Sequence, residues 1–453
     1  MRIPRILLAA PASGSGKTLI TCGILKALAN RGLRVAAFKC GPDYIDPMFH
    51  SRVLGISSGN LDTFFTGEET TRYLFGKEAS HADISVLEGV MGFYDGVAGI
   101  STRASAYDLA RVTGTPVVLI VDAKGMSLSV VALIKGFLEY QKDSRICGVI
   151  LNRVGAGIYP GLKAKIEAQL PVKVLGYVPQ AQEYVMESRH LGLVMPDEIE
   201  HLQEKLQGLA ELLEKTLEIE ELMALAEQAE DFEYQIPQLP RLKKDATLGI
   251  ARDEAFCFYY RDNLELLERM GAKLCFFSPL RDHGLPGGLD GMILYGGYPE
   301  LYADKLSSNE SMKRSIREAV VKGMPYLAEC GGFMYLHETL EDMDRNAYPM
   351  VGIIPGRAYG TGRLNRFGYI TLTAKESQVL GEAGAAIKGH EFHYFDSTCN
   401  GESFQAKKPL SKREWSCIHG DMQGAAGFPH LYYYSNPEMI FHFLQACAGE
   451  KEQ

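Results

Sequence analysis

Residues 7–18 read LLAAPASGSGKT and combine an apolar run, a turn of small residues and the start of a helix. That order is the context in which a phosphate-binding loop is expected. Glycines at 14 and 16 let backbone N–H groups close around phosphate oxygens, and a helix that begins near residue 17 directs the positive end of its dipole at them. A lysine adds a cation for the outer phosphates, and a threonine hydroxyl can ligate Mg²⁺. The pattern therefore predicts a site for ATP and Mg²⁺ made by Gly14, Ser15, Gly16, Lys17 and Thr18.

The loop departs from the usual pattern at its first position, where Pro11 stands in place of a glycine. With proline at this position the loop is less similar to the loops of motor and signalling NTPases. The loop resembles that of the dethiobiotin-synthetase type, whose enzymes phosphorylate carboxylates.

Two series of short apolar runs alternate with amphipathic stretches. The first series comprises residues 6–10, 35–39, 84–88, 117–122, 148–152 and 174–178, and the second comprises 247–251, 273–277, 291–294 and 326–329. Strands without a polar face are typical of parallel sheets covered by helices on both sides. Between the series, residues 197–230 predict one or two exposed helices, and Pro237 and Pro240 indicate a linker. We therefore expect an α/β fold with two domains, residues 1–235 and 245–453.

Length and composition limit the function further. A chain of 453 residues is too long for one core, and 46% hydrophobic with 23% charged residues is typical of a folded soluble protein. The net charge of −9, without a basic run, argues against nucleic acid and anionic membranes and favours small-molecule substrates.

The cysteines and apolar runs indicate the compartment. Nine cysteines without a C-x-x-C pair indicate neither a disulfide framework nor a zinc site, so we expect a reducing compartment. No apolar run is long enough to span a bilayer, and residues 6–10 resemble a buried strand more than a signal peptide. We expect a cytoplasmic protein, and the sequence carries no signal for its oligomeric state.

Acidic residues follow the expected strands of the first domain. Asp43 and Asp46 come after residues 35–39, Glu88 ends residues 84–88, and Asp95 lies shortly beyond. The carboxyl ends of parallel strands share one edge of a sheet, where ligands bind. Mg²⁺ prefers one or two carboxylates together with phosphate oxygens. We predict that Glu88 and Asp43 bind the metal with Thr18, and that Asp43, Asp46 and Asp95 serve substrate binding or activation.

One amide side chain, Asn152, ends the strand at residues 148–152. At that place it either reads an adenine edge or forms a turn.

The second domain carries a pattern typical of a nucleophile elbow. Residues 325–336 read PYLAECGGFMYL, in which an apolar strand runs into small residues and then an apolar helix. On such a turn Cys330 is exposed at a helix N-terminus, where we expect the dipole to favour the thiolate. The amide of Gly331 can face an oxyanion, and Gly297, at the end of another strand, offers a second backbone donor.

A nucleophilic cysteine needs a base, and His430 in GFPHLYY (residues 427–433) is the candidate. Class I glutamine amidotransferases usually carry Glu two residues after this His, where this chain has Tyr432, so the third member is absent or comes from elsewhere. His390 and His393 in GHEFHY (residues 389–394) suggest a metal, but aromatic alternation there favours a strand, on which residues three apart point to opposite faces. Core or substrate-lining roles fit them better.

The motifs together carry a resemblance over nearly the whole chain. APASGSGKT, KCGPDYIDP, NLDT, EGVMGFYDG, RHLGL, ARDEAFCFYY, GGYPE and AECGGFMYL follow one another in the order seen in the cobyrinic acid a,c-diamide synthase family. The resemblance implies ATP- and Mg²⁺-dependent amidation of the a and c acetate groups of cobyrinate, a corrinoid tetrapyrrole, with glutamine as nitrogen donor. It implies Cys330 as nucleophile, His430 as base, and Asp43 and Asp95 near the activated carboxylate. The chain departs from the family at residues 430–433, where HLYY replaces HLHF.

Three other hypotheses remain at this stage. Hydrogenobyrinate and nickel-sirohydrochlorin are alternative substrates for the same reaction. A regulatory ATPase of the chromosome-partitioning kind, with an inactive glutaminase-like binding domain, is an alternative of another class, and it predicts ATP turnover without glutamine hydrolysis.

Overall fold

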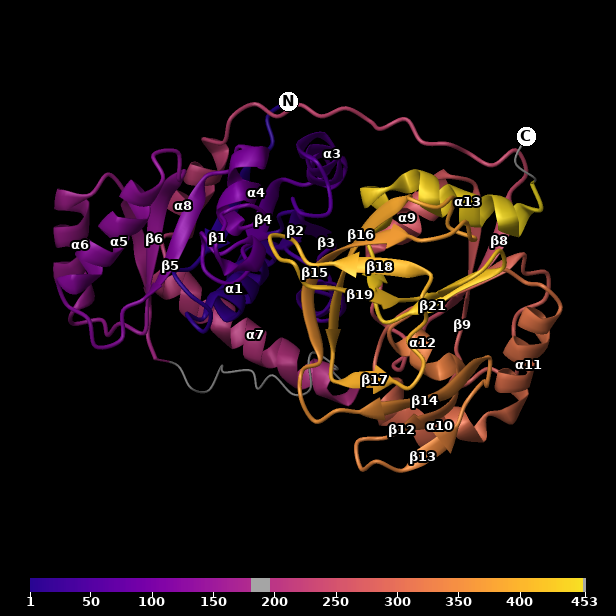
Figure 1. Ribbon diagram of the computed structural model, residues 1–453. Coiled ribbons are helices and arrows are strands. Elements are labelled where there is room, and N and C mark those ends of the chain that lie inside the picture. The colour runs from indigo at the N-terminus through magenta and orange to yellow at the C-terminus, as the bar shows by residue number, and fades with distance from the viewer. Residues whose placement is uncertain (181–195, 451–453) are drawn as a thin grey trace. The chain divides into compact units, whose positions relative to one another are not determined.

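The structure is a computed structural model that describes residues 1–180 and 196–450 (Figure 1). The RHLGL motif, residues 189–193, lies outside these ranges. The chain divides into two compact units, Met1–Pro237 and Gln238–Gln453. Each unit is built around its own parallel sheet, so the predicted α/β class is confirmed.

The N-terminal unit contains a seven-stranded parallel sheet in the order β3-β2-β4-β1-β5-β6-β7. Its strands are β1 (Arg5–Ala9), β2 (Val35–Cys40), β3 (Ser58–Leu61), β4 (Ile84–Glu88), β5 (Val117–Asp122), β6 (Ile146–Asn152) and β7 (Lys173–Val178). The six strands predicted from apolar runs are all present. The edge strand β3 was not predicted, because its sequence SGNL lacks the β-branched residues that favour strands.

Helices cover both faces of this sheet (Figure 1). They are α1 (Lys17–Asn30), α2 (Ile45–Arg52), α3 (Glu68–Ala79), α4 (Ala106–Thr113), α5 (Ser129–Tyr140), α6 (Tyr159–Gln169), α7 (Pro196–Thr216) and α8 (Ile219–Glu227). The prediction that the last two are exposed is wrong. Helix α7 packs along α1, with Leu209 and Leu213 buried against Gly23, where a Cβ would stand 2.5 Å from the Leu213 Cδ1. Their apolar faces are thus part of the core.

The C-terminal unit contains a six-stranded sheet in the order β20-β21-β11-β10-β8-β9, parallel except at β20. Its strands are β8 (Ala246–Ala251), β9 (Ala272–Phe277), β10 (Gly291–Leu294), β11 (Tyr326–Glu329), β20 (His419–Gly420) and β21 (Gly424–Gly427). Its helices are α9 (Arg261–Arg269), α10 (Ala303–Ser308), α11 (Glu310–Val321), α12 (Gly331–Leu336) and α13 (Pro437–Ala448).

Two smaller sheets extend this unit. One holds β13 (Ala347–Pro349), β12 (His337–Glu341), β14 (Ile354–Gly360) and β17 (Phe395–Ser397). The other holds β19 (Glu414–Cys417), β18 (Phe404–Lys407), β15 (Arg366–Ala374), β16 (Ala386–His393) and β22 (His430–Leu431). Across the described residues, no helix is both long and apolar enough to cross a bilayer. All nine cysteines lie in the described ranges and are free thiols.

Candidate active sites

The predicted phosphate loop connects the end of β1 to the start of α1 at Lys17. Gly14 and Gly16 have φ angles of 79° and 83°, in the left-handed region that glycine adopts without strain. A Cβ on Gly16 would stand 2.4 Å from Nδ2 of Asn152, which donates a hydrogen bond to the Ser15 carbonyl at 2.8 Å. Asn152 therefore holds the loop in this structure, and its predicted contact with adenine stays a prediction.

Two side chains at the start of α1 point to the neighbouring strand ends. The Lys17 ammonium donates to the Met91 carbonyl at 2.9 Å, and burial, with the Lys39 charge, lowers its pKa to about 8. The Thr18 hydroxyl donates to Glu88 Oε1 at 2.6 Å. The loop thus brings a cation and a hydroxyl to the end of β4.

Glu88 is positioned by the sheet itself. The register places it opposite Leu8 of β1 and opposite Lys39 of β2. Its side chain is fully buried, and burial raises its pKa, an effect that the Lys39 ammonium at 2.8 Å from Oε1 opposes. Lys39 also pairs with Asp46, and the attraction of both carboxylates outweighs burial and raises the Lys39 pKa.

Lys39 was not assigned a role from the sequence. A lysine inside the otherwise apolar strand VAAFKC is the signal that marks it, because a buried lysine requires a carboxylate partner. Its pairing also means that Asp46, predicted to act on substrate, is held by an ion pair in this structure.

The residues at the end of β4 fit Mg²⁺. Glu88 Oε2 is buried and accepts no hydrogen bond from the described residues, while Oε1 lies against the Thr18 hydroxyl. Oxygen donors of this kind suit a hard cation that completes its shell with phosphate oxygens and water. Within the described ranges, no three His, Cys, Asp or Glu side chains form a cluster able to hold a metal by themselves.

Asp43 accepts hydrogen bonds from the first turn of α2, the helix that follows β2. Its Oδ1 accepts the backbone N–H groups of Ile45 at 2.8 Å and Asp46 at 3.2 Å. Burial, followed by the nearby Asp46 charge, raises the pKa of Asp43 to about 6.

Asp95 lies in the loop after β4 and is exposed. Its Oδ2 accepts the Gly92 N–H at 3.0 Å, and a Cβ on Gly92 would stand 2.7 Å from the Pro11 carbonyl, so the loop folds against the phosphate loop. Asp95 also lines a cavity of about 510 Å³ together with Ile100 and Tyr140.

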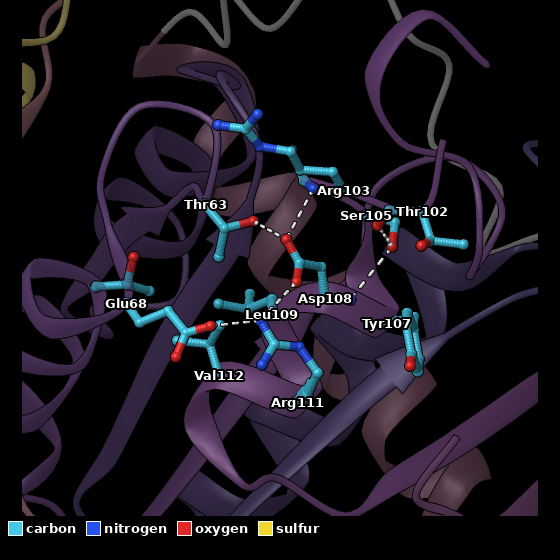
Figure 2. A network of polar contacts seen from close by, with 12 residues as sticks. Thr63, Glu68, Thr102, Arg103, Ser105, Tyr107, Asp108, Leu109, Arg111 and Val112 are labelled. Atoms are coloured by element: carbon cyan, nitrogen blue, oxygen red, sulfur yellow. Dashed lines mark hydrogen bonds and ion pairs between the residues drawn. The ribbon is translucent and has the colours of Figure 1, made fainter. Parts of the chain in front are cut away.

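The NLDT motif, residues 60–63, is bonded to the Asp43 loop and to the chain just before α4. Asn60 Nδ2 donates to the carbonyls of Gly41 at 3.0 Å and Asp43 at 2.6 Å. Figure 2 shows the Thr63 hydroxyl pointing at Asp108, whose Oδ2 accepts it at 2.7 Å and also accepts the Ala104 N–H at 2.9 Å. The motif therefore fixes the Asp43 loop and the chain just before α4.

The strand, turn and helix predicted for a nucleophile elbow are present in the C-terminal unit. Cys330 follows β11 with φ 47° and ψ −103°, a left-handed conformation that strains a residue with a side chain. A Cβ on Gly296 would stand 2.3 Å from Cε1 of His430 and 3.3 Å from Cβ of Cys330. The thiol-bearing residue and the imidazole thus face each other across a glycine that has no room for a side chain.

The two predicted amide donors lie side by side. A Cβ on Gly331 would stand 2.9 Å from the Gly297 nitrogen, and a Cβ on Gly297 would stand 2.1 Å from the Ala255 carbonyl oxygen. Both positions require glycine for close backbone approach. Their role as an oxyanion hole stays a prediction.

Cys330 is buried and not exposed as predicted, and the charge state of the resting pair also differs from the prediction. Burial, and then the Glu300 carboxylate, raises the pKa of Cys330 above its usual value, so the six-residue helix α12 does not keep it as a thiolate. Burial, and then His393, lowers the pKa of His430 to about 3. The resting pair is therefore a thiol beside a neutral imidazole, which can accept its proton.

A carboxylate stands behind His430, although the sequence left the third member open. Glu329 Oε2 lies 3.9 Å from His430 Nδ1 and accepts the Leu431 N–H at 3.3 Å, while Oε1 accepts the Tyr433 hydroxyl at 3.2 Å. Burial raises the pKa of Glu329 to about 8. Tyr432 instead donates to Asp262 at 3.3 Å. An acid directly before the cysteine is the signal that sequence reasoning missed.

His390 and His393 lie on a strand, β16, as predicted. The His390 ring stacks on His430 with centroids 5.0 Å apart, and the His393 ring stacks on Phe428 at 4.1 Å. Both histidines therefore line the surroundings of the proposed base.

Comparison with known proteins agrees with both units. Residues 6–193 match the model of the CobQ/CobB/MinD/ParA nucleotide binding domain, and residues 247–426 match that of the CobB/CobQ-like glutamine amidotransferase domain. Proteins named cobyrinate a,c-diamide synthase from Caldanaerobacter subterraneus subsp. tengcongensis, Listeria monocytogenes and Priestia megaterium are 43%, 40% and 36% identical. The matches cover 98%, 98% and 99% of this chain and 98%, 99% and 98% of those proteins. The chain therefore belongs to the cobyrinate a,c-diamide synthase family.

Proposed function

We propose that this protein uses ATP and glutamine to convert the a and c acetate carboxylates of cobyrinate into carboxamides, as a step of cobalamin biosynthesis. The observation that carries the proposal is the pair Cys330 and His430 facing each other across Gly296, in a chain whose other unit has a phosphate loop. The full-length similarity to cobyrinate a,c-diamide synthases supports the substrate. We place the reaction in the cytoplasm, consistent with nine free thiols.

The N-terminal unit activates the acid. A carboxylate resists attack by ammonia because its carbonyl is electron-rich and oxide is a poor leaving group. A carboxylate oxygen of the substrate attacks the γ-phosphorus of ATP, which forms an acyl phosphate and releases ADP. Lys17 and the loop amides stabilise the charge that develops on the phosphoryl oxygens. Asp43, which follows β2, and Asp95, on the loop that folds against the phosphate loop, are the residues proposed to orient the substrate.

Thr18 and Glu88 are the residues proposed to hold Mg²⁺. Bound there, the ion would neutralise charge on the β- and γ-phosphates. Lys39 limits the negative charge that Glu88 and Asp46 bring to this place, and its ammonium holds Glu88 directed at Thr18.

The C-terminal unit supplies ammonia. His430 takes the proton of the Cys330 thiol as the sulfur attacks the side-chain carbonyl of glutamine, and the amides of Gly297 and Gly331 face the oxyanion. The collapse of the tetrahedral intermediate, with the proton returned by His430, releases ammonia and leaves a thioester that water hydrolyses to glutamate. Glu329, whose Oε2 lies 3.9 Å from His430 Nδ1, is the residue proposed to orient the imidazole. Ammonia attacks the acyl phosphate and expels inorganic phosphate.

Cys330→Ser tests whether the C-terminal unit supplies ammonia while the N-terminal unit activates the acid. The variant is expected to lose glutamine hydrolysis and glutamine-dependent amidation but to keep amidation with ammonium chloride, because only the supply of nitrogen depends on the thiol. Unchanged glutamine hydrolysis would refute the nucleophile. If the unmodified protein hydrolyses ATP but no glutamine, that result would favour the partition-type ATPase. Parallel assays with cobyrinate, hydrogenobyrinate and nickel-sirohydrochlorin decide among the substrates.

A further inference from the structure

Five buried polar atoms on the neighbouring strands β15, β16 and β19 have no hydrogen-bond partner among the described residues. They are Arg366 Nη1, both carboxylate oxygens of Glu391, His393 Nε2 and Trp415 Nε1. Each such atom costs about 1–3 kcal/mol when it stays unsatisfied, and native proteins rarely leave them so. A cluster of five indicates a place that a polar ligand completes.

The atoms lie close enough to share one ligand. Glu391 Oε1 is 3.9 Å from Arg366 Nη1, and Glu391 Oε2 is 3.6 Å from His393 Nε2. Both distances are too long for hydrogen bonds. The Arg366 guanidinium carbon lies 5.2 Å from the centre of the Trp415 ring. The carboxylate and the guanidinium therefore form a long ion pair without a hydrogen bond between them.

The cluster adjoins the glutaminase pair. Strand register places His390 opposite His430, whereas Glu391, the next residue on β16, shares the other face of the strand with His393. His393 stacks on Phe428, and the Phe428 ring lies 5.2 Å from that of Phe333, three residues after the nucleophile. The Glu391 side chain is 0% exposed, and charges interact more strongly in such a region of low dielectric than in water.

We propose that Glu391 binds the α-ammonium group of glutamine and that Arg366 binds its α-carboxylate. The proposal rests on the glutaminase activity proposed above. Glutamine carries opposite charges on one carbon, and the cluster offers the two complementary charges at neighbouring positions. Its amide carbon, at the other end of the molecule, is the atom that must reach Cys330. The site therefore selects an amino acid rather than a plain amide.

Binding in this manner also affects the nucleophile. After burial and Glu300, the Glu391 carboxylate is among the causes that raise the pKa of the Cys330 thiol. An α-ammonium group beside Glu391 cancels that charge, so bound glutamine eases loss of the thiol proton.

The test compares glutamine with glutaramate, which has the same amide and carboxylate but hydrogen in place of the ammonium group. For the wild type, kcat/KM for glutamine is expected to exceed that for glutaramate by about 10²-fold, the factor typical of a charge-assisted hydrogen bond. Glu391→Gln is expected to lower kcat/KM for glutamine by that factor, mainly through KM, and to leave glutaramate within about 3-fold. Arg366→Met should abolish the corresponding preference for glutamine over 4-aminobutanamide, which lacks the carboxylate.

Controls separate binding from folding. Glu341→Gln removes another buried carboxylate of this unit, one that pairs with Arg357 at 3.4 Å, and should keep the preference for glutamine. Glu391→Asp keeps the charge and should keep part of the preference. Ammonia-dependent amidation should be unchanged in every variant.

Three results decide the matter. A Glu391→Gln enzyme that still prefers glutamine over glutaramate by the wild-type factor overturns the proposal, and so does an equal loss with both amides. If Cys330→Ser leaves glutamine hydrolysis intact, the proposed function itself fails, which is a different outcome.

Discussion

Gly296→Ala introduces a single methyl group between the proposed nucleophile and its base. The new Cβ would stand 2.3 Å from Cε1 of His430, whereas ordinary contact begins at 3.4 Å, so the imidazole has to move by about 1 Å. The φ of Gly296 is not in the left-handed region, so alanine adds no backbone strain there. The substitution therefore acts through the geometry of the pair.

A displacement of about 1 Å in a catalytic group costs about 10²-fold in rate, or about 2.7 kcal/mol of transition-state stabilisation. Glutamine hydrolysis, measured as glutamate released at saturating glutamine, is expected to fall by about that factor. Ammonia-dependent amidation should stay at the wild-type rate, because the N-terminal unit performs the activation.

A matched control is Gly287→Ala, where the added Cβ meets no described atom within 4 Å and φ is again not left-handed. This variant should hydrolyse glutamine at the wild-type rate. A Gly296→Ala enzyme within about 3-fold of the control would refute the idea that Cys330 and His430 work across this glycine.

Three further outcomes are expected. Lys17→Ala should abolish glutamine- and ammonia-dependent amidation while glutamine hydrolysis continues, and retained ATP-dependent product formation would exclude the phosphate role. Asn60→Ala removes two hydrogen bonds that hold the Asp43 loop and should lower ammonia-dependent amidation about 10-fold without affecting glutamine hydrolysis. Burial lowers the pKa of His337 to about 4, so the unfolded chain binds more protons between pH 6.5 and 4, and stability present above pH 6.5 is lost as the pH falls. From pH 7 to 5 this histidine should remove about 2 kcal/mol from the free energy of unfolding, and urea titration of His337→Gln should lack that part of the loss; an unchanged loss would contradict the assignment.

Strands that carry apolar runs were predictable because parallel sheets bury both faces, and the ten runs named from the sequence are strands in the structure. The edge strand SGNL was missed, since its small and polar residues owe their conformation to pairing with β2. The burial of α7 was missed too, because it depends on α1 being near, which local periodicity does not reveal.

In the candidate sites, too, residues in local motifs were predictable and those that depend on long-range pairing were not. Cys330, Lys17 and Thr18 lie in local motifs whose chemistry is readable from adjacent residues, so they were found. The pairing of Lys39 with Glu88 depends on the β2–β4 register, and the distance from Glu329 to His430 depends on the return of the chain a hundred residues later. The proposed role of Glu391 can be inferred only from the fold, because β15, β16 and β19 bring its unsatisfied polar atoms close to those of other residues.

Amidation by the proposed route requires that ATP phosphorylates the substrate carboxylate before ammonia attacks it. Cobyrinate labelled with ¹⁸O in its acetate carboxylates tests this directly, by mass analysis of the phosphate released during amidation. One labelled oxygen in inorganic phosphate for each amide formed is the predicted result, because ammonia expels the carboxylate oxygen bound to phosphorus. Label in AMP, or phosphate free of label while amide accumulates, would contradict it.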